Sequence, residues 1–267
     1  MLIVSRRTVS SAFDSEALAW VQALETLDGQ ALESGVRNAI NAFVVGCKAD
    51  QSPNAGVSNW QALEHFQLYR GPRTLPAALY TPKGPAVTNV GFTLSNYTRK
   101  THLQGGSPRY INLNRGASSD GQNNASMWIW VNQAATTNTT RYIGAQNSAG
   151  ISRIMDQTGT IVGNVNSLAT NYTGPPGSGQ RTGFIGVSRA SASQFTMRYN
   201  STDFTVTSAS VSPISLNYFL FARNNNGTPD GHTDAGVSAA ASGKAVNLAL
   251  MEARVATLLA AIAAAIP

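Results

Sequence analysis

The chain has 267 residues, long enough to bury a sizeable core, and we expect two compact units. Its formal net charge is +6, but the Lys and Arg residues are scattered, without the basic stripe and interleaved aromatic residues of a nucleic-acid interface. We therefore expect no nucleic-acid partner. The single Cys47 excludes an intramolecular disulfide framework.

The first part of the chain has the apolar spacing of helices. Apolar residues at three- and four-residue steps predict one helix over 14–27 and a second over 30–48. Ser58 with Gln61 three residues later forms a capping-box pattern. A third helix is therefore expected to begin there and to end near Tyr69.

From residue 70 onward, short alternating runs separated by turn residues replace the helical pattern. Their even spacing favours an antiparallel sandwich over a parallel sheet with crossover helices. The expected organisation is a helical module in residues 1–69, followed by a β-sandwich domain in 70–267. The fold class is thus mainly β, an antiparallel β-sandwich with an N-terminal α-helical module and a C-terminal helix. The candidate strands are 77–80, 90–94, 101–103, 109–113, 126–131, 141–145, 151–156, 160–165, 182–189, 194–199, 203–207 and 218–223.

The last 20 residues predict an amphipathic, alanine-rich helix at about 248–265, with Asn247 as its cap. Glu252 and Arg254 interrupt its apolar run, so we expect no membrane insertion. We favour packing of this helix on its own domain. The alternative is that it joins identical helices in an oligomer.

The acidic residues of the sandwich region do not form the pattern of a glycoside hydrolase. Such an enzyme needs two carboxylates flanking the scissile bond, and no two acids here are spaced two residues apart along a strand. The three histidines are isolated from one another in sequence, and no serine-nucleophile motif accompanies them. We therefore expect no enzymatic activity. The acids of this region are Asp120, Asp156, Asp203, Asp230, Asp234 and Glu252.

Two groups of Asn and Asp residues have side-chain oxygens suited to calcium. Asn225 and Asp230 belong to an Asn-rich segment near the end of the sandwich, and Asp120 with Asn123 and Asn124 forms a second group. The favoured interpretation is that these side chains stabilise tight turns. No cofactor is therefore expected, with calcium as the alternative.

Trp128 and Trp130 lie in the alternating run Ser-Met-Trp-Ile-Trp-Val. If Met127, Ile129 and Val131 face the core, the two indoles emerge together on the opposite face of the strand. Adjacent indoles on a sheet face stack on sugar rings or are buried under another subunit. The sequence predicts one of these two uses rather than a place in the core.

Several segments resemble structural proteins of tailed phages, including cyanophages. The similar runs are 96–105, 109–111, 114–115 and 120–124. The order of elements from Thr182 to the end also resembles the concanavalin A-like (laminin G-like) sandwiches of phage and bacterial surface proteins. This resemblance implies a virion component with a jelly-roll sandwich and implies no catalytic site.

The resemblance leads to two hypotheses for the function. The first is a structural protein of the tail or baseplate that binds host cell-surface glycans or serves in assembly. The second is a capsid decoration protein that stabilises the head. Both imply a location in the virion after synthesis in the host cytoplasm, with other virion proteins as partners. The alanine-rich helix and the N-terminal amphipathic pair further predict a homo-oligomer, specifically a trimer.

Overall fold

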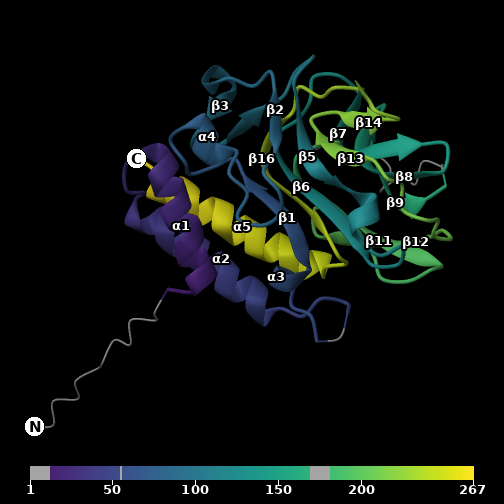
Figure 1. Cartoon of the computed structure of the whole chain (residues 1–267), viewed down its shortest axis with the longest axis horizontal. Helices are drawn as coiled ribbons and strands as arrows, with labels where there is room; N and C mark the ends of the chain where they lie inside the picture. The colour runs from purple at the N-terminus through teal and green to yellow at the C-terminus, as the bar shows by residue number, and fades with distance from the viewer. Residues whose placement is uncertain (1–12, 55, 169–180) are drawn as a thin grey trace, which may run out of the picture.

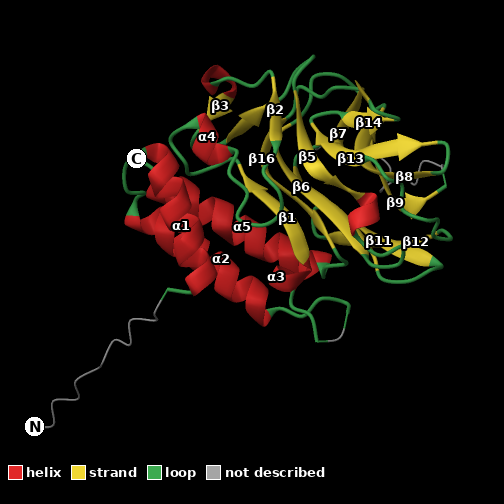
Figure 2. Cartoon of the chain, viewed as in Figure 1, coloured by secondary structure: helices red, strands yellow, loops and turns green. Residues whose placement is uncertain are grey.

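Two facing β-sheets and a layer of helices build the protein (Figure 1). The computed structural model describes residues 13–54, 56–168 and 181–267. The helices lie on one side of the strands, so the layers follow the order helices, first sheet, second sheet (Figure 2). We call the first sheet the helix-covered sheet and the second the outer sheet. The chain is therefore mainly β, with sheets that face each other as in a sandwich.

Within the described residues, each sheet has eight strands. The helix-covered sheet has the order β12-β11-β10-β6-β16-β4-β3, and β1 also pairs with β16. The outer sheet has the order β15-β14-β7-β13-β5-β2, and β8 and β9 extend it from β7. Neighbouring strands are antiparallel except β14 and β7, which are parallel. The strands of the helix-covered sheet are β1 (Leu63–Leu68), β3 (Tyr97–Thr98), β4 (His102–Gln104), β6 (Ala125–Gln133), β10 (Gly183–Arg189), β11 (Gln194–Tyr199), β12 (Thr202–Thr207) and β16 (Gly236–Gly243). Those of the outer sheet are β2 (Thr88–Val90), β5 (Tyr110–Gly116), β7 (Thr139–Asn147), β8 (Gly150–Gln157), β9 (Thr160–Ser167), β13 (Asn217–Leu220), β14 (Arg223–Asn225) and β15 (Thr228–Asp230).

Most predicted helices are confirmed, including their caps. The Asp14 carboxylate accepts hydrogen bonds from the first backbone N–H groups of α1, and Asn247 caps α5 in the same way. By length and composition, α5 is also a candidate membrane span. In the structure its inner side packs on α2 and β10. The helices are α1 (Ser15–Asp28), α2 (Ser34–Ala49), α3 (Asn59–Ala62), α4 (Leu75–Ala78) and α5 (Leu248–Ala265).

Three predicted elements are wrong. The strand expected over 90–94 coincides with β2 only at Val90, because the chain leaves the sheet at Gly91 and a single helical turn begins at Leu94. The third helix ends at Ala62, after one turn with the expected capping box, and the chain continues as β1. The strand expected over 77–80 falls on α4, where Thr74 caps the turn and Pro76 occupies its start. Proline is well tolerated there because the first turn leaves its backbone N–H groups unpaired in any case.

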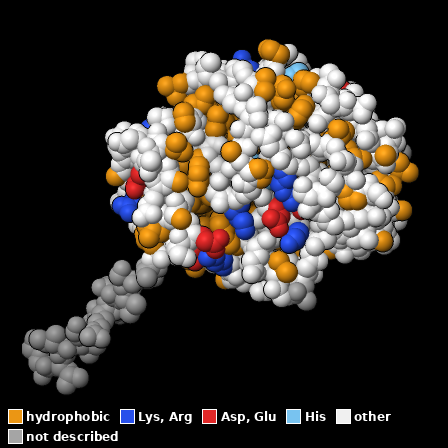
Figure 3. Space-filling view, in the orientation of Figure 1, with side chains coloured by type: hydrophobic (Ala, Val, Ile, Leu, Met, Phe, Trp, Pro, Cys, Tyr) orange, Lys and Arg blue, Asp and Glu red, His pale blue; other side chains and the backbone are white. Residues whose placement is uncertain are grey.

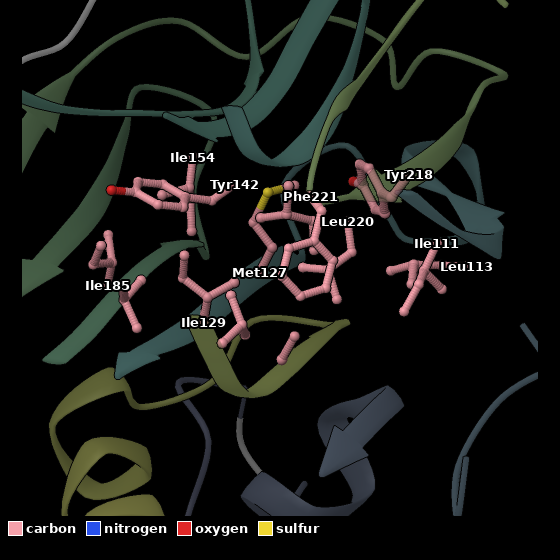
Figure 4. Close-up of a cluster of buried hydrophobic side chains, with 14 of the residues drawn as sticks. Ile111, Leu113, Met127, Ile129, Tyr142, Ile154, Ile185, Tyr218, Leu220 and Phe221 are labelled. Atoms are coloured by element: carbon pink, nitrogen blue, oxygen red, sulfur yellow. The ribbon is translucent and has the colours of Figure 1, made fainter. Parts of the chain in front are cut away.

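The core between the two sheets is built from alternate residues of their facing strands (Figure 4). Met127 and Ile129 of β6 and Ile185 of β10 supply one side. Tyr142 of β7 and Leu220 of β13 belong to the other. All five side chains are fully buried, which is the burial expected where the inner faces of a sandwich interdigitate.

A second core fills the space between the helices and the helix-covered sheet. It joins residues of α1, α2 and α5 to residues of β1, β6, β10 and β16. The ion pairs Arg198–Glu252 and Arg254–Asp50 fasten α5 to β11 and to the residue that follows α2. β1 ends at Leu68, before the domain boundary expected at residue 69, and it pairs with β16 from the other side of that boundary. The two expected units therefore pack against each other without a break.

Charged side chains are few on the surface. On the face shown in Figure 3, blue and red side chains gather below the centre, where the helices meet the strands. Most of the remaining face is white, with scattered orange side chains. This distribution agrees with the low share of charged residues, 12% of the chain. A group of charged side chains gathered in one place is therefore unusual in this protein.

Candidate functional site

The structure contradicts the surface patch expected at Trp128. The alternation along β6 is as predicted, with Met127 and Ile129 between the sheets and Trp128 on the opposite face. That face is covered by the helical layer, and the Trp128 side chain is fully buried. Its ring centroid lies 5.8 Å from that of Phe66 and 5.5 Å from that of Phe184. Trp128 is therefore a core residue, because the helices bury the second face of this sheet.

Trp130 belongs to the same second core but remains partly exposed. The structure thus separates the two indoles that the sequence pattern placed together. A contact role for Trp130 stays a prediction, and a surface made by both rings together is excluded by the burial of Trp128.

The structure does bring Asn225 and Asp230 together, but around an arginine. β14 and β15 form a hairpin whose turn, Asn226 and Gly227, has positive φ at both positions. The Asp230 carboxylate accepts hydrogen bonds from Arg223, with Nε to Oδ1 at 2.9 Å, and from the Asn225 amide at 3.2 Å. The Asp230 carboxylate is therefore already paired with a guanidinium, and a calcium site at Asn225 and Asp230 stays a prediction.

The second expected calcium group is also engaged. Arg115 donates two hydrogen bonds to Asp120, from Nη1 to Oδ2 at 2.8 Å and from Nη2 to Oδ1. Among the residues that the structure describes, no three His, Cys, Asp or Glu side chains lie close enough to hold a metal ion.

Three arginines gather on the outward face of the outer sheet. Arg141 comes from β7, Arg153 from β8 and Arg223 from β14. Arg153 Nη1 donates to Gln146 Oε1 at 2.8 Å, and Arg223 Nη1 donates to the same oxygen. We call Arg141, Arg153 and Arg223, with Asp230 and Gln146, the arginine cluster.

Two glycines make room for these long side chains. Gly144 lies opposite Arg153 in the β7–β8 ladder, and a Cβ at Gly144 would lie 2.5 Å from the Arg153 Cβ. A Cβ at Gly231 would lie 2.1 Å from Arg141 Cδ. Both residues have positive φ, which also favours glycine. The backbone is therefore shaped around the arginine side chains.

The charges of the cluster do not balance. Burial, followed by the positive charges of Arg223 and Arg141, lowers the pKa of Arg153 to about 10, and Asp230 acts in the opposite direction. The pKa of Arg141 is also lowered, first by burial and then by Arg223. Only 6% of Arg153 and 6% of Arg223 is exposed. Within the described residues, three guanidinium groups thus share one paired carboxylate in a poorly hydrated position.

Aromatic rings adjoin the cluster on the same face. Phe219 of β13 lies opposite Gly144 in the ladder, and its ring centroid is 4.6 Å from that of Tyr110 on β5. The Tyr110 ring also lies 6.3 Å from the ring of His232. Tyr110 is partly exposed, whereas Phe219 is buried beneath it. The face therefore combines charged donors with a ring that a ligand can reach.

Buried nitrogen atoms on this face include Nε of Arg141 and Nε2 of His232, for which the described residues supply no hydrogen-bond partner. The two residues lie together, because the backbone N–H of Arg141 donates to the carbonyl oxygen of Gly231 at 2.7 Å. Burial lowers the pKa of His232. Unpaired buried polar atoms are rare in proteins, and they can mark a place where a ligand or an ion binds.

A separate groove of about 290 Å³ lies where the β10–β11 connection meets the start of α5. Ser188, Phe195, Asp203 and Asn247 are among its lining residues. Its one charged side chain, Asp203, is already paired with Arg198 at 2.8 Å. The groove therefore offers less unbalanced charge than the arginine cluster, which we take as the candidate site.

Sequence reasoning missed the arginine cluster because its members are far apart along the chain. Arg141 and Arg153 belong to one hairpin, but Arg223 follows 70 residues after Arg153. The sequence contains a local indication of the site, which is an arginine in one short strand and a glycine in the strand that pairs with it. Pairing of strands decides whether such residues meet, and single-sequence patterns do not reveal it.

Comparisons with known proteins identify the fold. No protein-family model matches the sequence, and no curated protein matches it. The solved structure of Trypanosoma rangeli sialidase in complex with 2,3-difluorosialic acid matches with a TM-score of 0.54 at 8% identity, covering 84% of this chain and 38% of the sialidase. The binding domain of botulinum neurotoxin serotype D matches with a TM-score of 0.51 at 10% identity, covering 73% of this chain and 51% of that one. This chain thus spans about half or less of these proteins, and the similarity shows a shared β-sandwich fold.

Proposed function

We propose that this chain is a non-enzymatic structural protein of a tailed-phage particle whose sandwich binds a host-surface glycan. The binding surface is the outward face of the outer sheet. One observation carries the proposal: guanidinium groups from β7, β8 and β14 converge beside the Tyr110 and Phe219 rings. Convergent polar donors beside an accessible aromatic ring are the usual means of holding a sugar.

The finer fold assignment belongs to the same proposal. We assign the sandwich to the concanavalin A-like jelly-roll type, on the resemblance of its terminal strands and helix. Its neighbours in fold include a toxin binding domain and a sialidase solved with 2,3-difluorosialic acid. These support a carbohydrate-binding role without assigning this chain their activities.

The paired acids support binding rather than catalysis. Asp120 is held by Arg115, Asp156 by Arg181 and Glu252 by Arg198. A carboxylate whose oxygens are held by a guanidinium is not free to contact a substrate as a general acid or base. The arrangement therefore suits recognition of a sugar more than cleavage of one.

An assembly role, including the alternative of a capsid decoration protein, is favoured by a different surface. The outward faces of α2 and α5 carry exposed apolar residues, with Val45 47% and Leu250 38% exposed. On α5, Ala253 and Ala260 are exposed as well. A face of this kind suits contact with other virion proteins or with further copies of the chain in a trimer.

The binding role is tested by applying the full chain to an array of bacterial surface glycans. We expect binding to a defined subset, weakened by Tyr110→Ala and unchanged by Tyr80→Ala. Tyr80 is a suitable control because it is a partly exposed tyrosine beside α4 that packs against the second core rather than against the arginine cluster. Absence of binding to every glycan, or equal loss in the two variants, would contradict the glycan-binding role.

The location is tested separately by antibody labelling of intact particles in the electron microscope. Labelling of the tail or baseplate supports the first hypothesis. Labelling of the head alone supports the decoration role, and particles without any label would refute a place in the virion.

A further inference from the structure

The ligand of the candidate site can be specified further from the charge of the arginine cluster. Resting on the proposed glycan binding, we infer that this site recognises an anionic group, the carboxylate of an acidic sugar, through Arg141 and Arg223. Three features support this assignment: the excess of positive charge in the cluster, its hydrogen-bond donors that have no acceptor, and its small size.

The cluster holds more positive than negative charge. The chain has 13 acidic residues, and all of them lie within the described ranges. Asp230 is the acid that pairs with the cluster among these residues. Three partly buried guanidinium groups around one carboxylate leave an excess positive charge that is costly to bury. An external anion would compensate that excess.

The donors also require an acceptor. Arg141 Nε is buried and has no hydrogen-bond partner among the described residues. Gln146 Oε1 already accepts hydrogen bonds from two arginines, so it has little capacity left for a third. A carboxylate has two oxygens with about four acceptor positions and matches a guanidinium in a bidentate geometry. An oxyanion therefore fits the vacant donors better than a neutral hydroxyl does.

The compactness of the site distinguishes a sugar acid from a nucleic acid. A phosphate polymer is bound along a stripe of basic residues, with several phosphates neutralised at once. Here the positive charge is confined to one small cluster that includes Asp230, beside the Tyr110 ring. One anionic group attached to a ring is the ligand that matches this arrangement.

The test compares polygalacturonate with its methyl ester, in which each carboxylate is replaced by an uncharged ester. We expect the full chain to bind the acid form at least about tenfold more tightly, since a hydrogen bond to a charged group contributes roughly tenfold to a hundredfold in affinity. Added salt should weaken binding of the acid form only. Equal binding of the two polymers would overturn the inference while leaving the proposed glycan binding intact.

Variants locate the effect on the cluster. Arg141→Gln should weaken binding of polygalacturonate about tenfold or more, whereas Arg37→Gln should leave it unchanged. Arg37 is a matched control because it lies on α2, where it pairs with Glu25 at 3.6 Å. Equal affinities of the two variants would contradict the inference.

Asp230→Asn guards against a loss caused by misfolding. Removing the negative charge next to Arg223 should strengthen binding of the acid polymer, and a damaged fold cannot produce that gain. Weaker binding by a variant that melts at the wild-type temperature would count against the charge assignment.

Two further probes separate the sources of the anion. If dextran sulfate binds and this binding depends on Arg141, the site also accepts tetrahedral oxyanions. If a DNA duplex displaces polygalacturonate as well as free polygalacturonate does, the ligand is a nucleic acid rather than a sugar acid. If neither polygalacturonate form binds, titration with free sulfate decides whether the anion site exists. A shift of the Arg141 Nε resonance would keep the anion site and refute its assignment to this sugar acid. No shift would refute the inference, while the glycan array decides the glycan-binding role independently.

Discussion

At the scale of single residues, the buried His65 is expected to make the stability of the fold depend on pH in the acidic range. This histidine lies on β1 and is fully buried. Burial, followed by the positive charge of Arg115, lowers the pKa of its imidazole to about 4 from the ordinary 6.5. The native state therefore holds His65 neutral at a pH where the unfolded chain already binds a proton.

We predict that stability falls as the pH is lowered from 6.5 towards 4. In this window the unfolded state takes up more protons than the folded state, so the free energy of unfolding decreases. The loss attributable to His65 is on the order of 3 kcal/mol. Urea unfolding of the wild type and of His65→Leu at several pH values measures it.

The variant should lose most of this pH dependence. His102→Gln is the matched control, because burial also lowers the pKa of His102 but leaves it partly exposed. If the two variants show the same pH dependence, His65 is not the dominant group.

Trp128 provides a second prediction at this scale. Its side chain is fully buried between Phe66 and Phe184, so Trp128→Ala should lower the free energy of unfolding by about 3–5 kcal/mol. Trp130→Ala should cost less, because Trp130 is partly exposed. Thermal and urea unfolding of the two single variants provide the comparison, and equal losses would contradict the assigned burial.

At the scale of elements, β16 was missed because its sequence is atypical of a strand. It reads Gly-Val-Ser-Ala-Ala-Ala-Ser-Gly, with Val237 as its one β-branched residue and without the aromatic residues that also indicate a strand. In the ladders, Ala241 lies between Phe66 of β1 and Trp128 of β6. The two rings meet at 5.8 Å between centroids, so the strand between them has space for only a small side chain.

Enlarging that residue should therefore destabilise the protein. Ala241→Leu is expected to cost about 1–3 kcal/mol through overpacking of the second core. The control is Ala253→Leu on the exposed side of α5, which should change stability by no more than about 0.5 kcal/mol. A neutral effect of Ala241→Leu in urea unfolding would show that the aromatic rings can separate at little cost.

At the scale of the whole molecule, much of the apolar surface that predicted a trimer is used within one chain. The inner sides of α1, α2 and α5 cover the helix-covered sheet and are buried there. The trimer remains a prediction that rests on the smaller exposed set, including Val45 and Leu250.

A charge placed on that exposed face should separate the subunits. We predict a trimer by native mass spectrometry and its dissociation by Ala260→Glu, because burying an unpaired carboxylate in an interface is costly. Gln22→Glu on the exposed side of α1 is the control with the same change in charge. A wild-type chain that is monomeric both free and in the particle would refute the prediction.

The sequence by itself determined the elements whose signals are local. The caps Asp14 and Asn247, the closing helix and most strands from β4 to β13 followed from apolar period and turn residues. Tertiary structure alone decided which faces are covered and which distant residues meet. Alternation placed Trp128 opposite Met127 but did not reveal the helices that bury it. Strand pairing brought Arg223 beside Arg153, because a ladder joins residues without regard to their separation along the chain.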